Sequence, residues 1–358
     1  VETTTSNATS SLTINNNDFN NFGHTVAGTG AITFINSSMA YLNTTITNNT
    51  FTNINCNTTG SVTFISNSIT VPGGGSQTIN NNSIVTAFNK TGAGGTVTGI
   101  TSGGSSTTVT SNWNNNNFSN ITVTGTTAIT IINNTDGGSV NHNIIGNVIS
   151  NIIGGSSAII AINSSYGGAN GGNGNLVSGN TISNITSSGA ITGISIGSSG
   201  TTSTVSGNAI SGLSSTGIAA VIGISSAAPT SGFILKNKIC DLQANNASGT
   251  VSGIVISAGT VHTVVNNVIG DLRTPSANAA NPLVGINITG GTTANVYYNT
   301  VYLNGTSSGA LFGSSAISAS TSLALTLRNN IFVNTSVPNG ATGYTAAYRR
   351  SSTTLTSY

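Results

Sequence analysis

The stretch "GNTISNI" at residues 179–185 recurs along the chain with little change. Close copies are "GNVISNI" at 146–152, "GNAISGL" at 207–213 and "KNKICDL" at 236–242. When the first Asn of each copy is taken as an anchor, eleven anchors follow one another at intervals of 28 to 34 residues. They are Asn17, Asn49, Asn82, Asn116, Asn147, Asn180, Asn208, Asn237, Asn267, Asn299 and Asn330. A period this regular predicts a solenoid with coils of about 31 residues.

Apolar residues occupy fixed positions around each anchor. The residues three before and two after the anchor are large and apolar in every repeat, and the residue five after it is apolar in most. In the repeat of Asn180 these residues are Val177, Ile182 and Ile185. This spacing does not give one helical stripe, and it fits short strands separated by corners. Such strands cannot bury a core alone, so we expect coils stacked about 4.8 Å apart to share one.

A second strand is visible in most repeats, at 97–103, 191–197, 221–226, 252–257 and 284–289. Each of the last four contains a glycine, which suggests a bend or a column of small residues: Gly193, Gly223, Gly253 and Gly285. Parallel strands joined by crossovers are nearly always right-handed. The sequence therefore predicts an all-β fold, a right-handed parallel β-helix of about eleven coils and roughly 50 Å in height. Residues 1–358 would form one domain, with regular coils over 11–340 and terminal segments at 1–10 and 341–358 that continue or cap the stack.

The anchor asparagines have a physical reason to recur. At a corner, Asn tolerates left-handed backbone angles and bonds its own backbone. Stacked coil on coil, each side-chain amide could also donate to one neighbouring Asn and accept from the other, as in known amide ladders. A weaker second ladder is expected four residues after the anchor, from Asn21, Asn53, Asn120, Asn151, Asn184 and Asn334.

Few residues are charged, and this excludes some classes of binding partner. Only 3% of residues are charged, and the net charge is +2. The seven basic residues are scattered, so we expect no nucleic-acid partner. Apolar stretches such as 217–224 are too short and too rich in glycine for membrane insertion. The chain starts at Val1 rather than Met, which suggests a mature or trimmed chain whose leader was removed.

The repeats "YYNTVYLNG" (297–305) and "LRNNIFVN" (327–334), followed by "YRRSSTTLTSY" (348–358), look like repeat regions of large secreted surface proteins of Bacteroidetes-type bacteria. The whole chain resembles the pectate-lyase-like right-handed β-helix superfamily. This resemblance implies an architecture and an extracellular or cell-surface location. It implies no activity, because one fold carries many functions.

Enzymes of that superfamily cleave polysaccharides with clustered carboxylates, and the chain has five acidic residues. Asp241 and Asp271 both lie four residues after an anchor in successive coils, so stacking would place them roughly 5 Å apart. They could form a calcium site or a carboxylate pair. They could equally replace ladder asparagines, with Lys236, Lys238 and Arg273 offsetting their charge. Calcium prefers six to eight oxygen ligands, which favours the second interpretation.

No other cofactor site is expected, because the sequence has no His pair, no Cys–His cluster and no zinc spacing. The two cysteines, Cys56 and Cys240, lie six repeats apart, too far for a disulfide. A binding surface is expected at Tyr297, Tyr298 and Tyr302, since exposed aromatic residues commonly mark recognition. The alternative is that these tyrosines pack the last coils.

Neither end of the chain shows an obvious cap over its strand edges. Either the chain belongs to a longer protein that continues the stack, or copies stack end to end into a fibre. The function predicted from the sequence is a non-catalytic, extracellular structural solenoid, as a filament subunit or the stalk of a surface adhesin. Its partners would be further copies of itself or flanking domains. The alternative function is a carbohydrate-binding or polysaccharide-degrading β-helix that takes cell-surface glycans.

Overall fold

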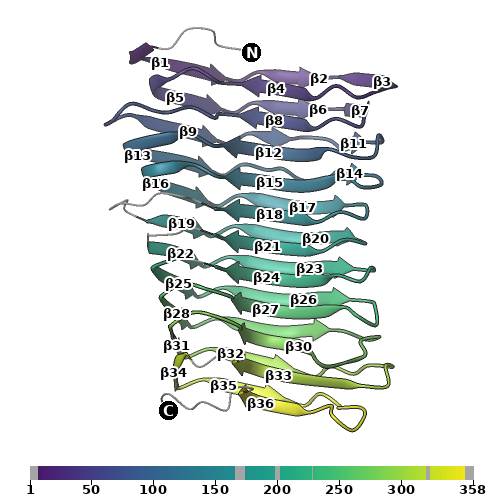
Figure 1. Ribbon diagram of the computed structural model, residues 1–358. Helices are drawn as coiled ribbons and strands as arrows, with labels where there is room; N and C mark the ends of the chain where they lie inside the picture. Colours follow the sequence, from purple (N-terminus) through teal and green to yellow (C-terminus); the bar gives the residue numbers. More distant parts are fainter. Residues whose placement is uncertain (1–6, 166–173, 198–201, 228, 320–322, 351–358) are drawn as a thin grey trace.

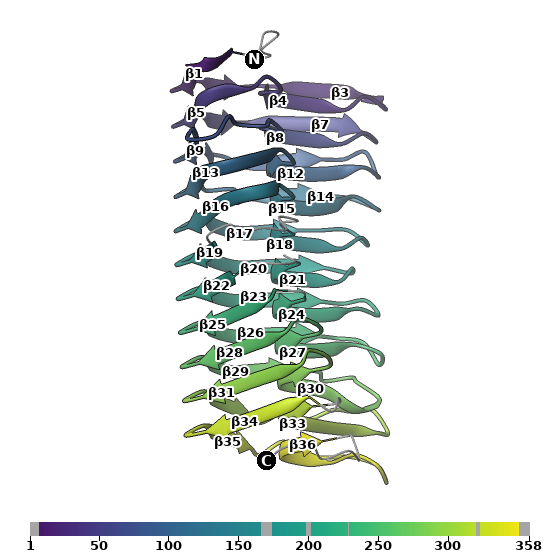
Figure 2. The same ribbon diagram turned by 60° about the vertical axis from the view of Figure 1, so that its left-hand side comes forward.

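The computed structural model describes residues 7–165, 174–197, 202–227, 229–319 and 323–350. These residues form strands, turns and loops without a helix. The coils are stacked along one axis, with the N-terminal coil at the top of Figure 1 and the C-terminal coil at the bottom. Figure 2 shows the same stack from another side, with like strands lying directly over one another. Strands in neighbouring coils pair in parallel, which confirms the predicted solenoid.

Three long sheets run the length of the stack, and each has eleven strands over the described residues. The first sheet precedes the anchors and contains β1 (Asn7–Asn15), β5 (Tyr41–Thr47), β9 (Ser76–Asn80), β13 (Ser105–Asn114), β16 (Gly137–Ile145), β19 (Asn175–Ser178), β22 (Thr202–Ser206), β25 (Ser231–Leu235), β28 (Val261–Val265), β31 (Thr293–Tyr297) and β34 (Ala324–Arg328).

The second sheet follows the anchors and contains β3 (Gly23–Gly28), β7 (Ile54–Thr58), β11 (Phe88–Lys90), β14 (Ile121–Val123), β17 (Val148–Ile153), β20 (Thr181–Ser187), β23 (Ala209–Ser215), β26 (Lys238–Ala244), β29 (Val268–Arg273), β32 (Thr300–Leu303) and β35 (Ile331–Asn334). In the first coils a short separate sheet comes just before it, made of β2 (Asp18–Asn20), β6 (Thr50–Thr52) and β10 (Ser83–Ile84).

The third sheet contains the second strand, which the sequence predicts in most repeats. Its members are β4 (Ile32–Asn36), β8 (Val62–Ser66), β12 (Thr96–Ser102), β15 (Ala128–Asn134), β18 (Ile159–Ser164), β21 (Ile191–Ile196), β24 (Ala220–Ser226), β27 (Thr250–Ile256), β30 (Ala279–Ile288), β33 (Phe312–Ala319) and β36 (Thr345–Arg350).

The three predicted apolar columns line one continuous core. In the coil of Asn180, the side chains of Val177, Ile182 and Ile185 are fully buried. The exceptions lie in the end coils, where Phe19, Leu327 and Phe332 are only partly buried and Phe22 is 38% exposed. Burial therefore comes from the coil above and the coil below, as expected for a solenoid.

The left-handed backbone at the corner belongs to the residue before each anchor, which corrects the expectation that the anchor itself adopts it. That residue has φ between 53° and 67° in every coil, as at Asn16, Gly179 and Lys236. The anchor is then free to turn its side chain inward. A second left-handed residue lies four after the anchor, as at Asn151 and Asn184. It bends the strand, so that the side chains two and five after the anchor both point into the core.

The anchor asparagines form an unbroken ladder of ten links from Asn17 to Asn330. In each link the side-chain Nδ2 donates to Oδ1 of the next anchor, at 2.9 Å between Asn180 and Asn208. The backbone N–H of Asn180 donates to the same oxygen. Its Nδ2 also donates to the carbonyl oxygen of Ile144 in the preceding coil. Every polar atom of this buried side chain thus has a partner, which removes the cost of burying it.

Close packing requires glycine in the glycine column of the third sheet. A methyl group at Gly223 would lie 2.6 Å from the carbonyl oxygen of Gly253 and 2.7 Å from Cγ2 of Ile239. Gly193 is similarly confined by Gly223, and Gly253 by Gly285. The column therefore lets the backbone of one sheet approach the core side chains of another.

Candidate functional site

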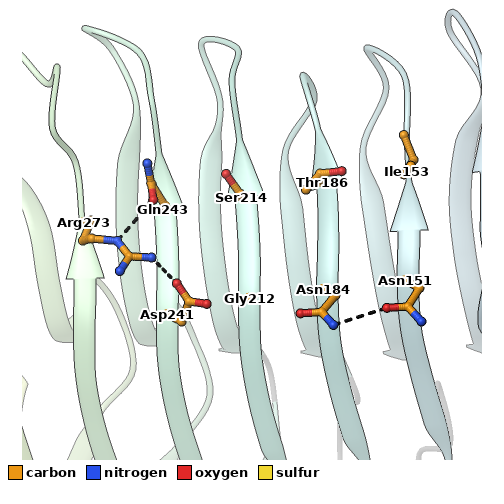
Figure 3. A pocket seen from close by; sticks show the side chains of 9 residues that line it. All are labelled: Asn151, Ile153, Asn184, Thr186, Gly212, Ser214, Asp241, Gln243 and Arg273. Carbon is orange, nitrogen blue, oxygen red and sulfur yellow. Dashed lines mark hydrogen bonds and ion pairs between the residues drawn. The ribbon is translucent and has the colours of Figure 1, made fainter.

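A groove of about 450 Å³ runs over the outer face of the second sheet, across β17, β20, β23, β26 and β29. Figure 3 shows it from close by, with two rows of side chains that cross the strands. The row four residues after the anchors contains Asn151, Asn184, Gly212 and Asp241. The row six residues after them contains Ile153, Thr186, Ser214, Gln243 and Arg273.

The first row lies on the left-handed residues, which explains the shape of the groove. Asn151, Asn184, Gly212 and Asp241 have φ between 55° and 66°, so each strand bends where they lie. Asn184 donates from Nδ2 to Oδ1 of Asn151 at 3.2 Å, and Asn151 donates in the same way to Asn120 at 3.0 Å. The predicted second ladder therefore exists here, and again between Asn53 and Asn21. It is exposed, unlike the anchor ladder.

Asn334 does not belong to this second ladder. The preceding coil has Leu303 at the equivalent position, so no asparagine lies beside it. Its Nδ2 donates to Oγ of Ser314 and to the carbonyl oxygen of Ala346, in the third sheet. The expectation for Asn334 was therefore wrong. It rested on spacing from the anchor alone, without the neighbour that a ladder requires.

Asp241 and Asp271 lie in neighbouring coils as predicted, and Arg273 connects them. The Nη1 atom of Arg273 donates to Oδ1 of Asp271 at 2.8 Å, while Nη2 bonds the carboxylate of Asp241. Its Nε donates to Oε1 of Gln243 at 3.2 Å. The guanidinium thus takes the place between the carboxylates that a cation would need. Within the described ranges, no cluster of three or more His, Cys, Asp or Glu side chains could hold a metal ion.

The tyrosines of the predicted binding surface lie in the coil that follows Arg273, the last residue of the groove. Tyr297 is half-buried, and its hydroxyl bonds Oδ1 of Asn295 at 3.1 Å. Tyr298 and Tyr302 are 59% and 45% exposed. Tyr298 also has φ 55°, a strained conformation for a bulky residue that Asn or Gly adopts in most other coils. The corner before the anchor imposes this conformation in every coil, so it does not by itself mark Tyr298 as functional.

Tyr302 belongs to an exposed apolar patch that the sequence did not single out. The patch consists of Val268, Tyr302, Ile331 and Val333, which are 40% to 59% exposed. Strand register places Tyr302 between Gly270 and Val333, and Thr300 between Val268 and Ile331. The sequence could have indicated this patch, because the equivalent outward positions are polar or small in most other coils.

The sequence did not single out a second feature, a buried pair of a carboxyl and an imidazole. Asp136 and His142 approach to 3.5 Å between Oδ2 and Nε2, and both side chains are almost fully buried. Asp136 accepts hydrogen bonds from Oγ of Ser102 at 2.5 Å and from the N–H of Gly104 at 2.7 Å. Burial raises the pKa of Asp136 to about 6, against the opposing effect of these two bonds. Burial lowers the pKa of His142 to about 3.

This pair does not have the arrangement of a hydrolytic triad. The Ser102 hydroxyl bonds the carboxylate, whereas the serine of a Ser-His-Asp triad bonds the imidazole that acts as its base. The loop that carries Asp136 turns between β15 and β16, so the group ties this loop to the preceding coil. His262 is also buried, and its Nε2 lies 3.1 Å from Oγ of Ser226. Burial lowers the pKa of His262 to about 4.

Lys90 is fully buried at the end of β11. Its Nζ donates to the carbonyl oxygens of Gly92 and Gly94 at 2.5 and 2.7 Å, and to Oγ1 of Thr127 at 3.2 Å. Burial lowers the pKa of this ammonium group. Burial also raises the pKa of the neighbouring Cys56 thiol to about 11, so that the thiol stays protonated at neutral pH. Cys56 and Cys240 are both free.

Among the described residues, no helix is long and apolar enough to cross a bilayer. Comparison with protein-family models, with curated proteins and with solved structures finds no match to this chain.

Proposed function

We propose that this chain is a rigid structural rod of the extracellular space or the cell surface, serving as a stalk or filament subunit. The observation that carries the proposal is the anchor ladder, which links every coil from Asn17 to Asn330 without a gap. The ladder, the continuous core and three long parallel sheets all run along the same axis. A structure bonded this way resists bending and stretching along its length.

The proposed location rests on the resemblance to repeats of secreted surface proteins. The outer surface is compatible with that setting, since amides, hydroxyls and few charges cover it. The buried Lys90, Asp136 and His142 have structural partners that account for them. They need no reaction to explain their presence.

Electron microscopy of the purified chain tests the proposal. Rods roughly 50 Å long for each chain are expected from the strand spacing. Compact or flexible particles would contradict the proposed structural role.

A second candidate is binding of a neutral polysaccharide along the second sheet. The observation in its favour is the groove lined by amide and hydroxyl groups from Asn151 to Gln243, with exposed Tyr298 and Tyr302 beyond it. Such groups hydrogen-bond sugar hydroxyls, and aromatic rings stack on sugar faces. A glycan array with the wild type and with Tyr302→Ala tests this candidate. Binding that the variant loses would support it, and cleavage of a bound glycan would overturn the non-catalytic proposal.

A further inference from the structure

We propose that the interior of this solenoid binds water molecules between the third sheet and the first sheet. The site lies between the ends of β8, β12, β15 and β18 and the strands β5, β9, β13 and β16, in the upper half of Figure 1. This inference goes beyond the proposed rod and does not depend on it.

Two columns of buried polar side chains border the site. The first column lies at or just after the last residues of the third-sheet strands, and it contains Asn67, Ser102, Asn134 and Ser164. The second column lies on the first sheet, and it contains Thr44, Gln77, Ser111 and His142. We call these two columns the polar strip.

The two columns face each other across the same part of the interior. Further along the stack, the first column continues to Ser226 and the second to His262. There, Oγ of Ser226 lies 3.1 Å from Nε2 of His262. Within the polar strip, Asp136 follows Asn134 by two residues and approaches His142 to 3.5 Å. Groups from both columns can therefore bond the same small ligand.

Several polar atoms in this region have no partner in the described part of the chain. They are Nδ2 and Oδ1 of Asn67, Oγ1 of Thr44 and Nε1 of Trp113. All three side chains are fully buried. Trp113 follows Ser111 by two residues on β13, and its ring lies edge-on to the His142 ring. Because buried polar groups almost always bond protein or ordered water, these atoms need a ligand.

The chemistry of these groups selects water as that ligand. The amide of Asn67 presents an unpaired donor and an unpaired acceptor, the indole N–H of Trp113 only donates, and the hydroxyl of Thr44 does both. A cation would bond only the oxygens, and an anion would bond only the donors. Water donates and accepts, and a buried water molecule typically makes about three hydrogen bonds.

The later coils show that the fold does not require polar residues in this region. Ile196, Ile256 and Ile288 occupy the first column there and are buried. Ser102 and Ser164 fill less of the equivalent space than isoleucine does, which leaves room for water molecules. The upper coils are therefore hydrated inside, whereas isoleucine keeps much of the same region dry in the later coils.

A high-resolution crystal structure of the chain of residues 1–358 tests the inference. Water is expected within about 2.7–3.2 Å of both Nδ2 and Oδ1 of Asn67, and at the same distance from Nε1 of Trp113. Asn82 is a control in the same map, because its buried Nδ2 and Oδ1 already bond Asn116 and Asn49. Protein partners on Asn67, a metal ion at its Oδ1 or an indole N–H without water would each overturn the inference.

A measurement in solution tests the same site. Oxygen-17 magnetic relaxation dispersion counts long-lived internal water molecules, and Asn67→Leu should hold at least one fewer than the wild type. The matched control is Asn55→Leu, the same substitution at an exposed position of the same coil, which should leave the number unchanged. Circular dichroism would verify that both variants are folded. Equal numbers in the wild type and a folded Asn67→Leu would overturn the inference.

The wild type alone also decides the question, should Asn67→Leu fail to fold. Trp113 is the only tryptophan of the chain, so its indole proton gives a single resonance. Nuclear Overhauser spectra should show a cross-peak between this proton and long-lived water. Absence of that cross-peak would contradict water binding in the polar strip and leave the proposed rod intact.

Discussion

A single buried polar residue shows how this fold holds together. Asn180 is 1% exposed, and all of its side-chain hydrogen-bonding groups are used. The internal anchor asparagines are tolerated in the core for this reason, while an unpartnered amide would cost about 1–3 kcal/mol. The ladder is therefore a stability element as well as a marker of register.

Replacing Asn180 by Ala should lower the free energy of unfolding by at least about 2 kcal/mol, because Asn147 and Ile144 lose buried partners. Denaturant titration followed by circular dichroism measures this loss. The matched control is Asn184→Gly, in the exposed ladder, where Gly212 already occupies the same column. It should change the stability by no more than about 0.5 kcal/mol. Equal losses in the two variants would contradict the distinction between the two ladders.

Ile182→Asp should unfold several coils, since the side chain of Ile182 is fully buried and an introduced carboxylate finds no partner there. Thr181→Asp is the control, because the neighbouring Thr181 is exposed. Thermal melting and limited proteolysis would compare the two variants. Melting of Ile182→Asp at the wild-type temperature would show that Ile182 does not point into the core.

At the scale of the strand and corner, the sequence predicts the period, the three apolar columns and the anchor ladder. The anchor and two of the apolar columns recur in all eleven repeats and the third column recurs in most, so the same signal is read many times. Features that occur once could not be found this way. The contact of Asp136 with His142 depends on how one loop folds back on the preceding coil.

The expectation from the sequence put the left-handed residue of the corner at the anchor, one position too late, for a related reason. Spacing shows that Asn recurs, but it does not show which neighbour turns the chain. In the structure the turning residue varies among Asn, Gly, Lys and Tyr, as at Asn266, Gly207 and Tyr298. The anchor stays Asn because the ladder needs an amide that both donates and accepts.

The glycine column gives a prediction at this scale. Gly223→Ala would place a methyl group 2.6 Å from the carbonyl oxygen of Gly253 in the next strand and 2.7 Å from Cγ2 of Ile239 in the second sheet. The backbone must move away from these atoms, so the melting temperature should fall by several degrees. Gly23→Ala is the matched control, since no atom lies within 4 Å of the position of its methyl group. Differential scanning calorimetry measures both variants. Similar melting temperatures would show that the third sheet is not closely packed at Gly223.

For the whole molecule, the buried titratable groups predict how stability depends on pH. The folded-state pKa values of His142 and His262, about 3 and about 4, lie below the ordinary 6.5. The unfolded chain therefore binds protons that the folded chain excludes, and stability falls as pH drops from 6.5 toward 4. Asp136 acts in the opposite sense. Its pKa is raised from 3.8 to about 6, so its contribution is full below pH 3.8 and is lost as pH rises through 6.

The two histidines together should outweigh Asp136, and the melting temperature should decrease between pH 6.5 and pH 4. Asp136→Asn removes the opposing contribution and keeps an oxygen to accept from Ser102 and Gly104. The decrease should then be steeper than in the wild type. Thermal melts across this pH range provide the comparison. A shallower decrease in Asp136→Asn would contradict the assignment of a buried, partly protonated carboxyl.

The central claim is that each repeat makes one full coil and that like positions lie on one straight line. Spin labels at positions 18, 181 and 331 test it directly, because Asp18, Thr181 and Ile331 are exposed and each follows its anchor by one residue, in the first, sixth and eleventh coils. Pulsed electron paramagnetic resonance should give about 24 Å for each neighbouring pair and about 48 Å for the outer pair, from a coil spacing of about 4.8 Å. Distances that do not add along one line would contradict the stacked-coil structure.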